Sequence, residues 1–309
     1  MVLRCDGTEM KLGAWMLVAV LAAAAGGCDS GNGDDGGANG SADGSAGSGG
    51  DPVASSKLLV LSTLGFTRMG KDGRVPGFNL DGKTSTKHDK TTCEKPDFVN
   101  PSGEKGIDNQ FATLVPLIEA GGLSAVEGLL QGAVDDGGLL IMLQVDGIDD
   151  PTDDPAVTVR VRAGTGKPLL GTDGVVLSGQ TFNLHEKSPE SLAKTARIEG
   201  GMLHAGPFDT LLPLTIFGVH YSFSVKGARI RARLLGDGDA DQGVFGGGLL
   251  VSDMIGIAKQ AEKFEKGVSD IVAPIAKIAG DMDKGPEGCR QVSMALAFSG
   301  VSAFLWDDK

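Results

Sequence analysis

Aromatic side chains that carry a polar group are scarce in this chain, which has one tyrosine and two tryptophans among its 309 residues. Trp306 is the only tryptophan besides Trp15, and Tyr221 is the only tyrosine. Carbohydrate-binding surfaces commonly stack sugar rings on exposed tryptophan and tyrosine side chains. The scarcity therefore argues against a sugar-binding module.

Positive charge is also in short supply. The chain has 28 lysines and arginines against 40 aspartates and glutamates, so its formal net charge is −12. Binding of nucleic acid depends on basic side chains that neutralise phosphates. No basic cluster in the sequence offers this, and we therefore expect no nucleic-acid partner.

Long apolar runs are lacking apart from one near the start. Leu12–Ala25 is an uncharged run preceded by Lys11. It is shorter than the roughly 20 residues that a membrane-spanning helix needs, and its length fits the apolar region of a secretory signal peptide.

The run ends at Ala25-Gly26-Gly27-Cys28. Small residues before a cysteine resemble the lipobox of bacterial lipoproteins. The resemblance implies cleavage before Cys28, transfer of a diacylglycerol to its thiol and, usually, acylation of the new amine. Two or more acyl chains anchor a protein firmly, whereas one binds a membrane marginally. The alternative is an ordinary cleaved signal that happens to meet a cysteine.

We therefore predict a signal peptide over residues 1–27 and a lipidated Cys28 that binds the membrane. This places the protein in the cell envelope, outside the cytoplasm and either periplasmic or surface-exposed. Asp29 resembles a signal for inner-membrane retention in some Gram-negative bacteria, but the rule varies between groups and leaves the choice of membrane open.

The segment after Cys28 is a predicted tether. Ser30–Pro52 contains only Gly, Ser, Ala, Asn, Asp and a final Pro. Such a segment cannot bury enough apolar surface to offset its ordering entropy, so we expect residues 28–52 to be disordered. A flexible coil of this length spans on the order of 25–30 Å. Residues 53–309 then form a single globular domain.

Cysteine is rare within that domain, which holds only Cys93 and Cys289; the other two, Cys5 and Cys28, belong to the export region. An isolated pair in an exported protein most simply forms one disulfide bond. A thiolate metal pair and a cysteine nucleophile are the alternatives, but neither cysteine has suitable partners beside it in the sequence.

Hydrophobic periodicity predicts an α+β fold: an antiparallel β-sheet or sandwich with helices near both ends of the domain. Asn109–Val134 and Met254–Met282 have helical spacing, the first broken at Gly121-Gly122 and the second bent at Pro274. Strands are predicted at Leu58–Leu64, Leu139–Val145, Val157–Arg162, Gly174–Leu177, Thr195–Leu203, Leu211–Phe217, Val219–Lys226, Ala228–Leu235 and Val292–Leu305.

Three acidic loops are candidate calcium sites, because calcium takes six to eight oxygen ligands in loops rich in Asp and Asn. Asp237, Asp239 and Asp241 alternate as at the start of an EF-hand loop, although the glycine comes one position late and Gly248 stands where the bidentate Glu belongs. Tight turns select the same residues. The other loops are Asp146–Asp154 and one that offers Asp97, Asn100 and Asp108, of which Asp108 is also a candidate N-cap for the first helix.

Catalytic signatures are absent from the sequence: there is no G-x-S-x-G and no H-E-x-x-H motif. Arg229, Arg231 and Arg233 alternate along one predicted strand face. They suit phosphate binding, but a solvated strand face is the simpler interpretation.

Together with the lipobox, Gly77–Gly82 (GFNLDG), Cys93, Asp97, Pro101–Gln110 (PSGEKGIDNQ) and Cys289 are similar to a group of uncharacterised bacterial lipoproteins, a resemblance that implies no activity. We expect a non-enzymatic binding or structural lipoprotein whose ligand or protein partner the sequence does not identify. A calcium-stabilised adhesion or assembly module and a hydrolase with a site assembled by the fold are the alternatives.

Overall fold

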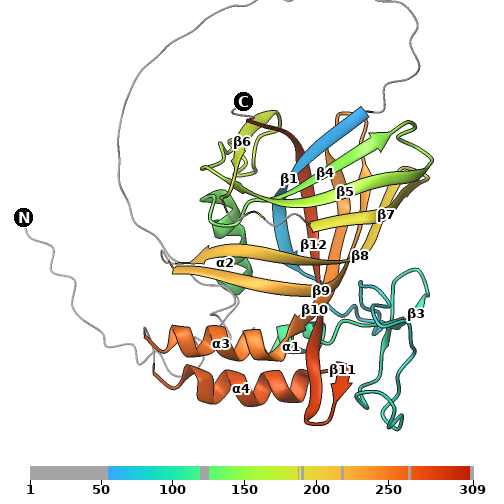
Figure 1. Ribbon diagram of the computed structural model, residues 1–309, viewed down its shortest axis with the longest axis vertical. Coiled ribbons are helices and arrows are strands. Elements are labelled where there is room, and N and C mark those ends of the chain that lie inside the picture. Colours follow the sequence, from blue (N-terminus) through green and yellow to red (C-terminus); the bar gives the residue numbers. More distant parts are fainter. Residues whose placement is uncertain are drawn as a thin grey trace, which may run out of the picture.

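Eight antiparallel strands close into a barrel in a computed structural model that describes residues 55–118, 125–186, 188, 191–216, 219–263 and 266–306 (Figure 1). Each strand pairs with the next one around the ring, and the last pairs with the first. In that order they are β1 (Ser55–Phe66), β4 (Ile141–Ile148), β5 (Asp154–Thr165), β7 (Ser191–Glu199), β8 (Met202–Ile216), β9 (Val219–Leu234), β10 (Ala240–Leu250) and β12 (Gly288–Leu305).

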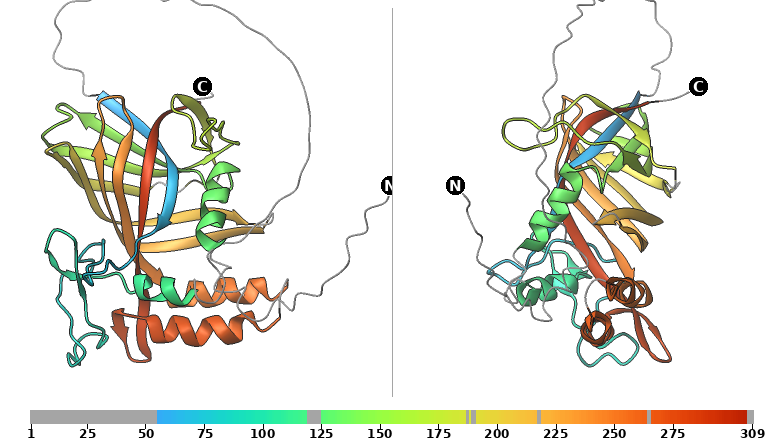
Figure 2. Two further views of the ribbon diagram at one scale, coloured as in Figure 1. Left: turned by 180° about the vertical axis from the view of Figure 1, so that it is seen from behind. Right: turned by 90° about the vertical axis from the view of Figure 1, so that its left-hand side faces the viewer.

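The remaining strands are short additions. β6 (Gln180–Leu184) pairs parallel to the end of β12, and β11 (Met282–Gly285) pairs with its beginning. β2 (Phe98–Val99) and β3 (Lys105–Ile107) form a small hairpin in the long segment that lies beside the barrel (Figure 2).

Within the part of the chain that the structure describes, four helices cover one end and one side of the barrel. α1 (Phe111–Ile118) and α2 (Ala125–Asp135) follow each other, with α2 packed along β1. α3 (Val251–Ala261) and α4 (Val268–Ala279) lie side by side across the lower end in Figure 1. No helix within the described ranges is both long and apolar enough to cross a membrane.

Period-two alternation sorts the side chains of each strand between the interior of the barrel and its outer surface. On β9, Ile230 and Ala232 are buried inside, while Arg229, Arg231 and Arg233 lie outside, as the sequence predicts. The upper part of the interior is a packed core in which large side chains, including those of Leu59, Leu143 and Leu203, have almost no exposed surface.

The predicted fold class is correct in part. The sheet is antiparallel and the helices fall in the two predicted regions, but the sandwich is wrong, because β12 returns to β1 and closes a single sheet. Strands dominate, and the helices are few.

Several strand predictions need correction. Thr195–Leu203 is the end of β7 and the start of β8, which turn at Gly200-Gly201, where both residues have positive φ. A two-residue turn of this kind favours glycine. Gly174–Leu177 forms only an isolated bridge between Leu170 and Val176.

The strands predicted at Val219–Lys226 and Ala228–Leu235 are the single strand β9, which passes through the irregular position Gly227. The predicted signal peptide and the whole of the predicted tether, with Cys28, lie outside the described residues.

Candidate functional site

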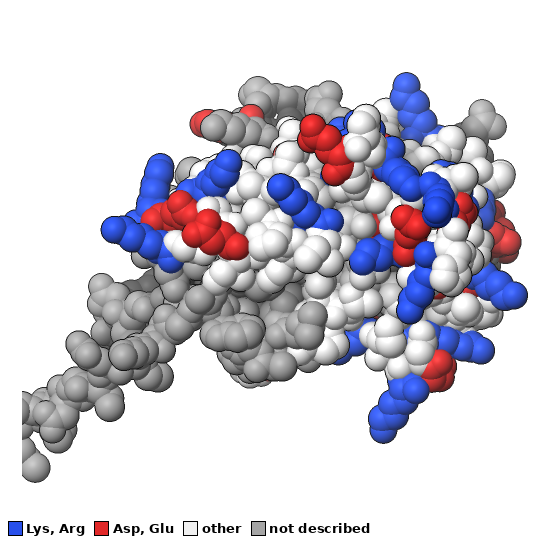
Figure 3. Space-filling view, turned by 90° about the horizontal axis from the view of Figure 1, so that it is seen from below, with Lys and Arg blue, Asp and Glu red and all other residues white. Residues whose placement is uncertain are grey.

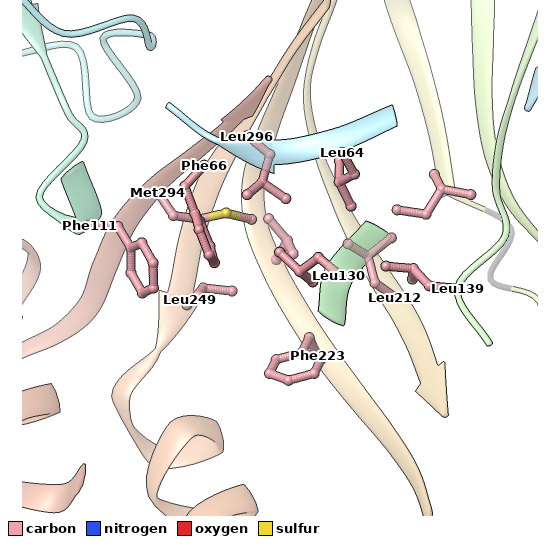
Figure 4. Close-up of a pocket in the computed structure, with 12 residues that line it drawn as sticks. Leu64, Phe66, Phe111, Leu130, Leu139, Leu212, Phe223, Leu249, Met294 and Leu296 are labelled. Carbon is pink, nitrogen blue, oxygen red and sulfur yellow. The ribbon is translucent and has the colours of Figure 1, made fainter. Parts of the chain in front are cut away.

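A cavity of about 80 Å³ lies inside the barrel where the barrel meets α1 and α2 (Figure 4). Six strands and the helices α1 and α2 contribute to its wall, and among the described residues no polar atom lines it. The lining side chains are those of Leu64, Phe66, Phe111, Leu130, Leu139, Ile141, Leu212, Phe223, Val225, Leu249, Met294 and Leu296.

The cavity exists because β1 and β4 separate. Their pairing runs only as far as Val60 and Met142, and β1 has an irregularity between Leu61 and Thr63. Beyond this point the two strands no longer share hydrogen bonds. The interior behind the gap is left without a complete wall of sheet.

Helix α2 takes the place of the missing strand partner. Gln131 Oε1 accepts a hydrogen bond from the Leu64 N–H at 3.1 Å, and Glu127 Oε1 accepts one from the Phe66 N–H at 2.9 Å. Buried backbone donors need such partners. Leu64 and Phe66 thus point into the cavity from a segment that side chains of α2 hold in place.

A charged contact fixes the outer side of α2. Arg68 pairs with Glu127 at 2.6 Å, and its hydrogen bond is the main reason that the pKa of the Glu127 carboxyl lies below its usual range. Glu127 is thus ionised at neutral pH and able to accept from both Arg68 and the strand. The pair lies outside the cavity, whose own lining carries no charge.

The chemistry open to the cavity is that of apolar contact. A wholly carbon and sulfur lining offers no hydrogen bond, so burial of a polar group there carries a penalty. Apolar cavities of this type stay dry and bind apolar molecules; an engineered one of about 150 Å³ takes benzene. A volume of about 80 Å³ admits a slimmer group, such as the end of an alkyl chain.

The predicted cation site at Asp97, Asn100 and Asp108 is divided among separate interactions. Asn100 closes its own turn, because its side-chain oxygen accepts from Ser102 and Glu104. Asp97 accepts from the Ser85 N–H, and Asp108 accepts from the N–H of Leu80 at 2.6 Å. The Asp108 carboxylate therefore caps a turn at Leu80 in place of helix α1.

Asp108 belongs to a buried acidic group that the sequence does not reveal. Burial raises its pKa to about 8, with further contributions from the negative charges of Asp81, Asp97 and Asp281. Burial also raises the pKa of Asp97, and that of Asp281 to about 7. At neutral pH Asp108 and Asp281 therefore retain protons, because each of these two carboxyls loses hydration and faces other carboxylates of like charge.

Asp281 joins this group from the far end of the chain. Its carboxylate accepts from the N–H of Ser293 at 2.7 Å and from the Ser293 hydroxyl, which in turn accepts from the Gln110 N–H. Asp281 also lines a polar cleft of about 440 Å³ beside Asp81, Cys93 and Lys284. No sequence spacing connects residues this distant.

The second predicted calcium site, at Asp237, Asp239 and Asp241, is likewise split. Asp237 accepts from the Asp239 N–H at 3.1 Å, and Asp239 accepts from the Ser302 N–H at 2.7 Å. Asp241 faces Arg233 at 3.8 Å.

The carboxylates of the loop Asp146–Asp154 likewise bind neighbouring groups of the protein. Asp146 pairs with Arg160, Asp150 accepts from Thr152, and Asp154 accepts from the Asp149 N–H. Among the described residues, no three Asp, Glu, His or Cys side chains group as metal ligands. Calcium binding stays a prediction.

Cys93 and Cys289 form a disulfide bond with their Cα atoms 5.9 Å apart. It joins the segment before α1 to the first residues of β12. Gly280 makes room for it, because a Cβ there would lie 2.7 Å from the Cys289 carbonyl oxygen.

Comparison with known proteins gives no relatives: no protein family, no curated protein and no solved structure matches the chain significantly.

Proposed function

We propose that this chain is a lipid-anchored exported protein that binds an apolar ligand inside its barrel and has a non-enzymatic role. The cavity with its wholly apolar lining is the observation that carries the proposal. The lipobox-like Ala25–Cys28 and the tether sequence support the anchor.

The ligand is expected to be slender and apolar at the end that enters. The lining offers it neither a charge nor a hydrogen bond, so affinity comes from removing hydrocarbon from water, at about 25 cal/mol per Å². A fatty acyl chain fits this description, because its terminal carbons are apolar and its head group can remain outside. The barrel supplies rigid walls, and the side chains of α2 hold the strand segment that lines the gap.

Filling the cavity is expected to prevent binding. Leu212 on β8 lines the cavity, whereas Leu211, the next residue, is exposed on the outer surface. We expect Leu212→Trp to weaken binding of a fluorescent polyene fatty acid at least ~10-fold, since the indole occupies the ligand volume and tenfold corresponds to only about 1.4 kcal/mol. Leu211→Trp introduces the same side chain outside and should bind as the wild type does.

The measurement is a fluorescence titration of the purified protein. Thermal unfolding of each variant shows whether it is folded, and Leu130→Phe fills the same cavity from α2 if Leu212→Trp does not fold. Equal affinities for the inward and outward variants would show that the fatty acid binds elsewhere and would contradict the proposal.

A further inference from the structure

Five large apolar side chains are exposed together at the end of the barrel away from α3 and α4. They lie in the loop before β6 and at the end of β12, and between 39% and 67% of each is exposed. We call this surface the apolar tip; it consists of Leu169, Leu170, Leu177, Phe304 and Trp306.

The apolar tip is held in shape by backbone pairing. The Leu177 N–H donates to the Leu169 carbonyl at 3.0 Å, and the Gln180 side chain binds both the N–H and the carbonyl of Leu169. β6 pairs with β12 at Phe304, and the Trp306 N–H donates to Phe182 at 2.9 Å. These hydrogen bonds fix the backbone of the apolar tip. Its side chains are therefore exposed in a defined arrangement and not because the segment is frayed.

The chain enters the barrel at this same end. Figures 1 and 2 show β6, the end of β12 and the first residues of β1 together at the top of the molecule. Ser56 and Lys57 of β1 line one surface hollow with Phe304. Residues 1–54, which include the proposed anchor, therefore join the domain beside the apolar tip.

The opposite end is the one that α3 and α4 cover. Seen from below, it carries lysine, arginine, aspartate and glutamate side chains of both signs, spread over its surface (Figure 3). Apolar side chains thus gather next to the point of attachment, although exposed aspartates such as Asp237 lie at the same end. An exposed apolar cluster of this kind marks a contact surface.

We propose that the apolar tip docks on the lipid bilayer that holds the N-terminal anchor; the docking rests on the proposed anchoring. Tryptophan and phenylalanine are favoured at the membrane–water interface, and Lys57 can extend its charged end to the head groups. The anchor turns docking into an intramolecular event, so a weak contact suffices at the high effective concentration that a short tether gives.

Trp306 provides a direct test, because Trp15 is the only other tryptophan. The full chain with Trp15→Phe is reconstituted into phosphatidylcholine vesicles with and without brominated lipid. We expect the protein to pellet with the vesicles, the Trp306 emission to shift to the blue, and brominated lipid to quench most of its intensity.

A matched pair of variants isolates the apolar tip. Leu177→Ser with Phe304→Ser should abolish the quenching and the blue shift while the protein still pellets. Ile278→Ser should leave both unchanged, because Ile278 is 69% exposed but lies on α4 at the other end. Circular dichroism confirms that each variant is folded.

The possible failures are distinguishable. A chain that stays in the supernatant overturns the anchor and the docking with it. A chain that pellets while Trp306 remains unquenched overturns the docking alone. Concentration-dependent self-association that shields Trp306 without lipid assigns the apolar tip to a second copy and also overturns the docking.

Discussion

Replacing Cys93 and Cys289 together by serine is expected to lower the free energy of unfolding by several kcal/mol. The bond closes a loop with a sequence separation of 196. In the chain-entropy model a loop of this length contributes at most ~5 kcal/mol, because the oxidised unfolded chain has fewer conformations than the reduced one.

The bond also fixes an irregular part of the structure. Lys284 donates to the Lys90 carbonyl near the bond, and Gln110 donates to Ser293 on β12. Together with the Phe78 ring, which lies under Arg231 of β9 at 5.8 Å, these hydrogen bonds would have to hold the segment on the barrel in the serine variant. We therefore expect this segment to lose protection from hydrogen exchange before the barrel does.

Urea unfolding of the oxidised protein and the double-serine variant measures the effect. The midpoint should fall and the slope of the free energy against urea should rise, since the unfolded variant exposes more surface. The double variant avoids a free thiol. A decrease of less than about 1 kcal/mol would contradict the entropic argument.

The second large effect is a loss of stability as the pH rises from about 4 to 8. Burial raises the pKa of Asp108 to about 8, whereas an aspartate in an unfolded chain titrates near ~3.9. The folded state therefore holds a proton that the unfolded state has released across this interval. The contribution of Asp108 to the free energy of unfolding is fully present below the pKa that this carboxyl has in the unfolded chain. It is lost as the pH rises through the pKa that the carboxyl has in the folded protein.

The expected size of the loss of stability follows from the same two pKa values of Asp108. The full pKa difference corresponds to a loss on the order of 5 kcal/mol, and relaxation and water penetration should reduce the measured loss to about 2–3 kcal/mol. Asp281, with a pKa raised to about 7, acts in the same direction.

Asp108→Asn tests this. The amide oxygen can still accept from the N–H groups of Leu80 and Asp81, so the free energy of unfolding at pH 4 should hardly change. At pH 8 the variant should be more stable than the wild type by about 2–3 kcal/mol. Chemical unfolding at several pH values gives the comparison.

Asp154→Asn is the matched control. Asp154 is also buried and also accepts from backbone N–H groups, which lower its pKa. A carboxyl of lowered pKa contributes stability above its unfolded pKa and loses it at lower pH, so this variant should be less stable at neutral pH. If the stabilities of both variants, relative to the wild type, changed with pH in the same direction, the raised pKa of Asp108 would be ruled out.

Local sequence pattern predicts most of the elements. The alternation of Arg229, Ile230 and Arg231 indicates a half-buried strand, and the helical spacing of Asn109–Val134 corresponds to the two helices α1 and α2, while Gly121-Gly122 lies outside the described residues. The sequence also limits the domain to two cysteines, which makes their pairing predictable. These signals depend on neighbours in the chain, and hydrophobic periodicity is a local property.

The barrel and its cavity depend on contacts that no local pattern contains. Alternation shows that Leu212 and Phe223 face inward, but whether the interior around them is filled depends on where β1 leaves β4. The acidic group is missed for the same reason, because Asp108 and Asp281 meet only after β12 has crossed the barrel. The calcium prediction rests on runs of aspartate, and the carboxylates of these runs accept from nearby backbone N–H groups or pair with arginines; no local pattern decides between these contacts and a cation.

Closure between the first and last strands has a consequence for how this protein folds. The Ser299 N–H donates to the Thr63 hydroxyl across a separation of 236 residues. Contacts so distant in sequence give a high contact order, and high contact order slows folding. Until β12 has emerged, β1 and β10 are open edges that can pair with other chains. In the export that we propose, the barrel is therefore completed only after the final residues have crossed the membrane, and until then the chain depends on protection from aggregation.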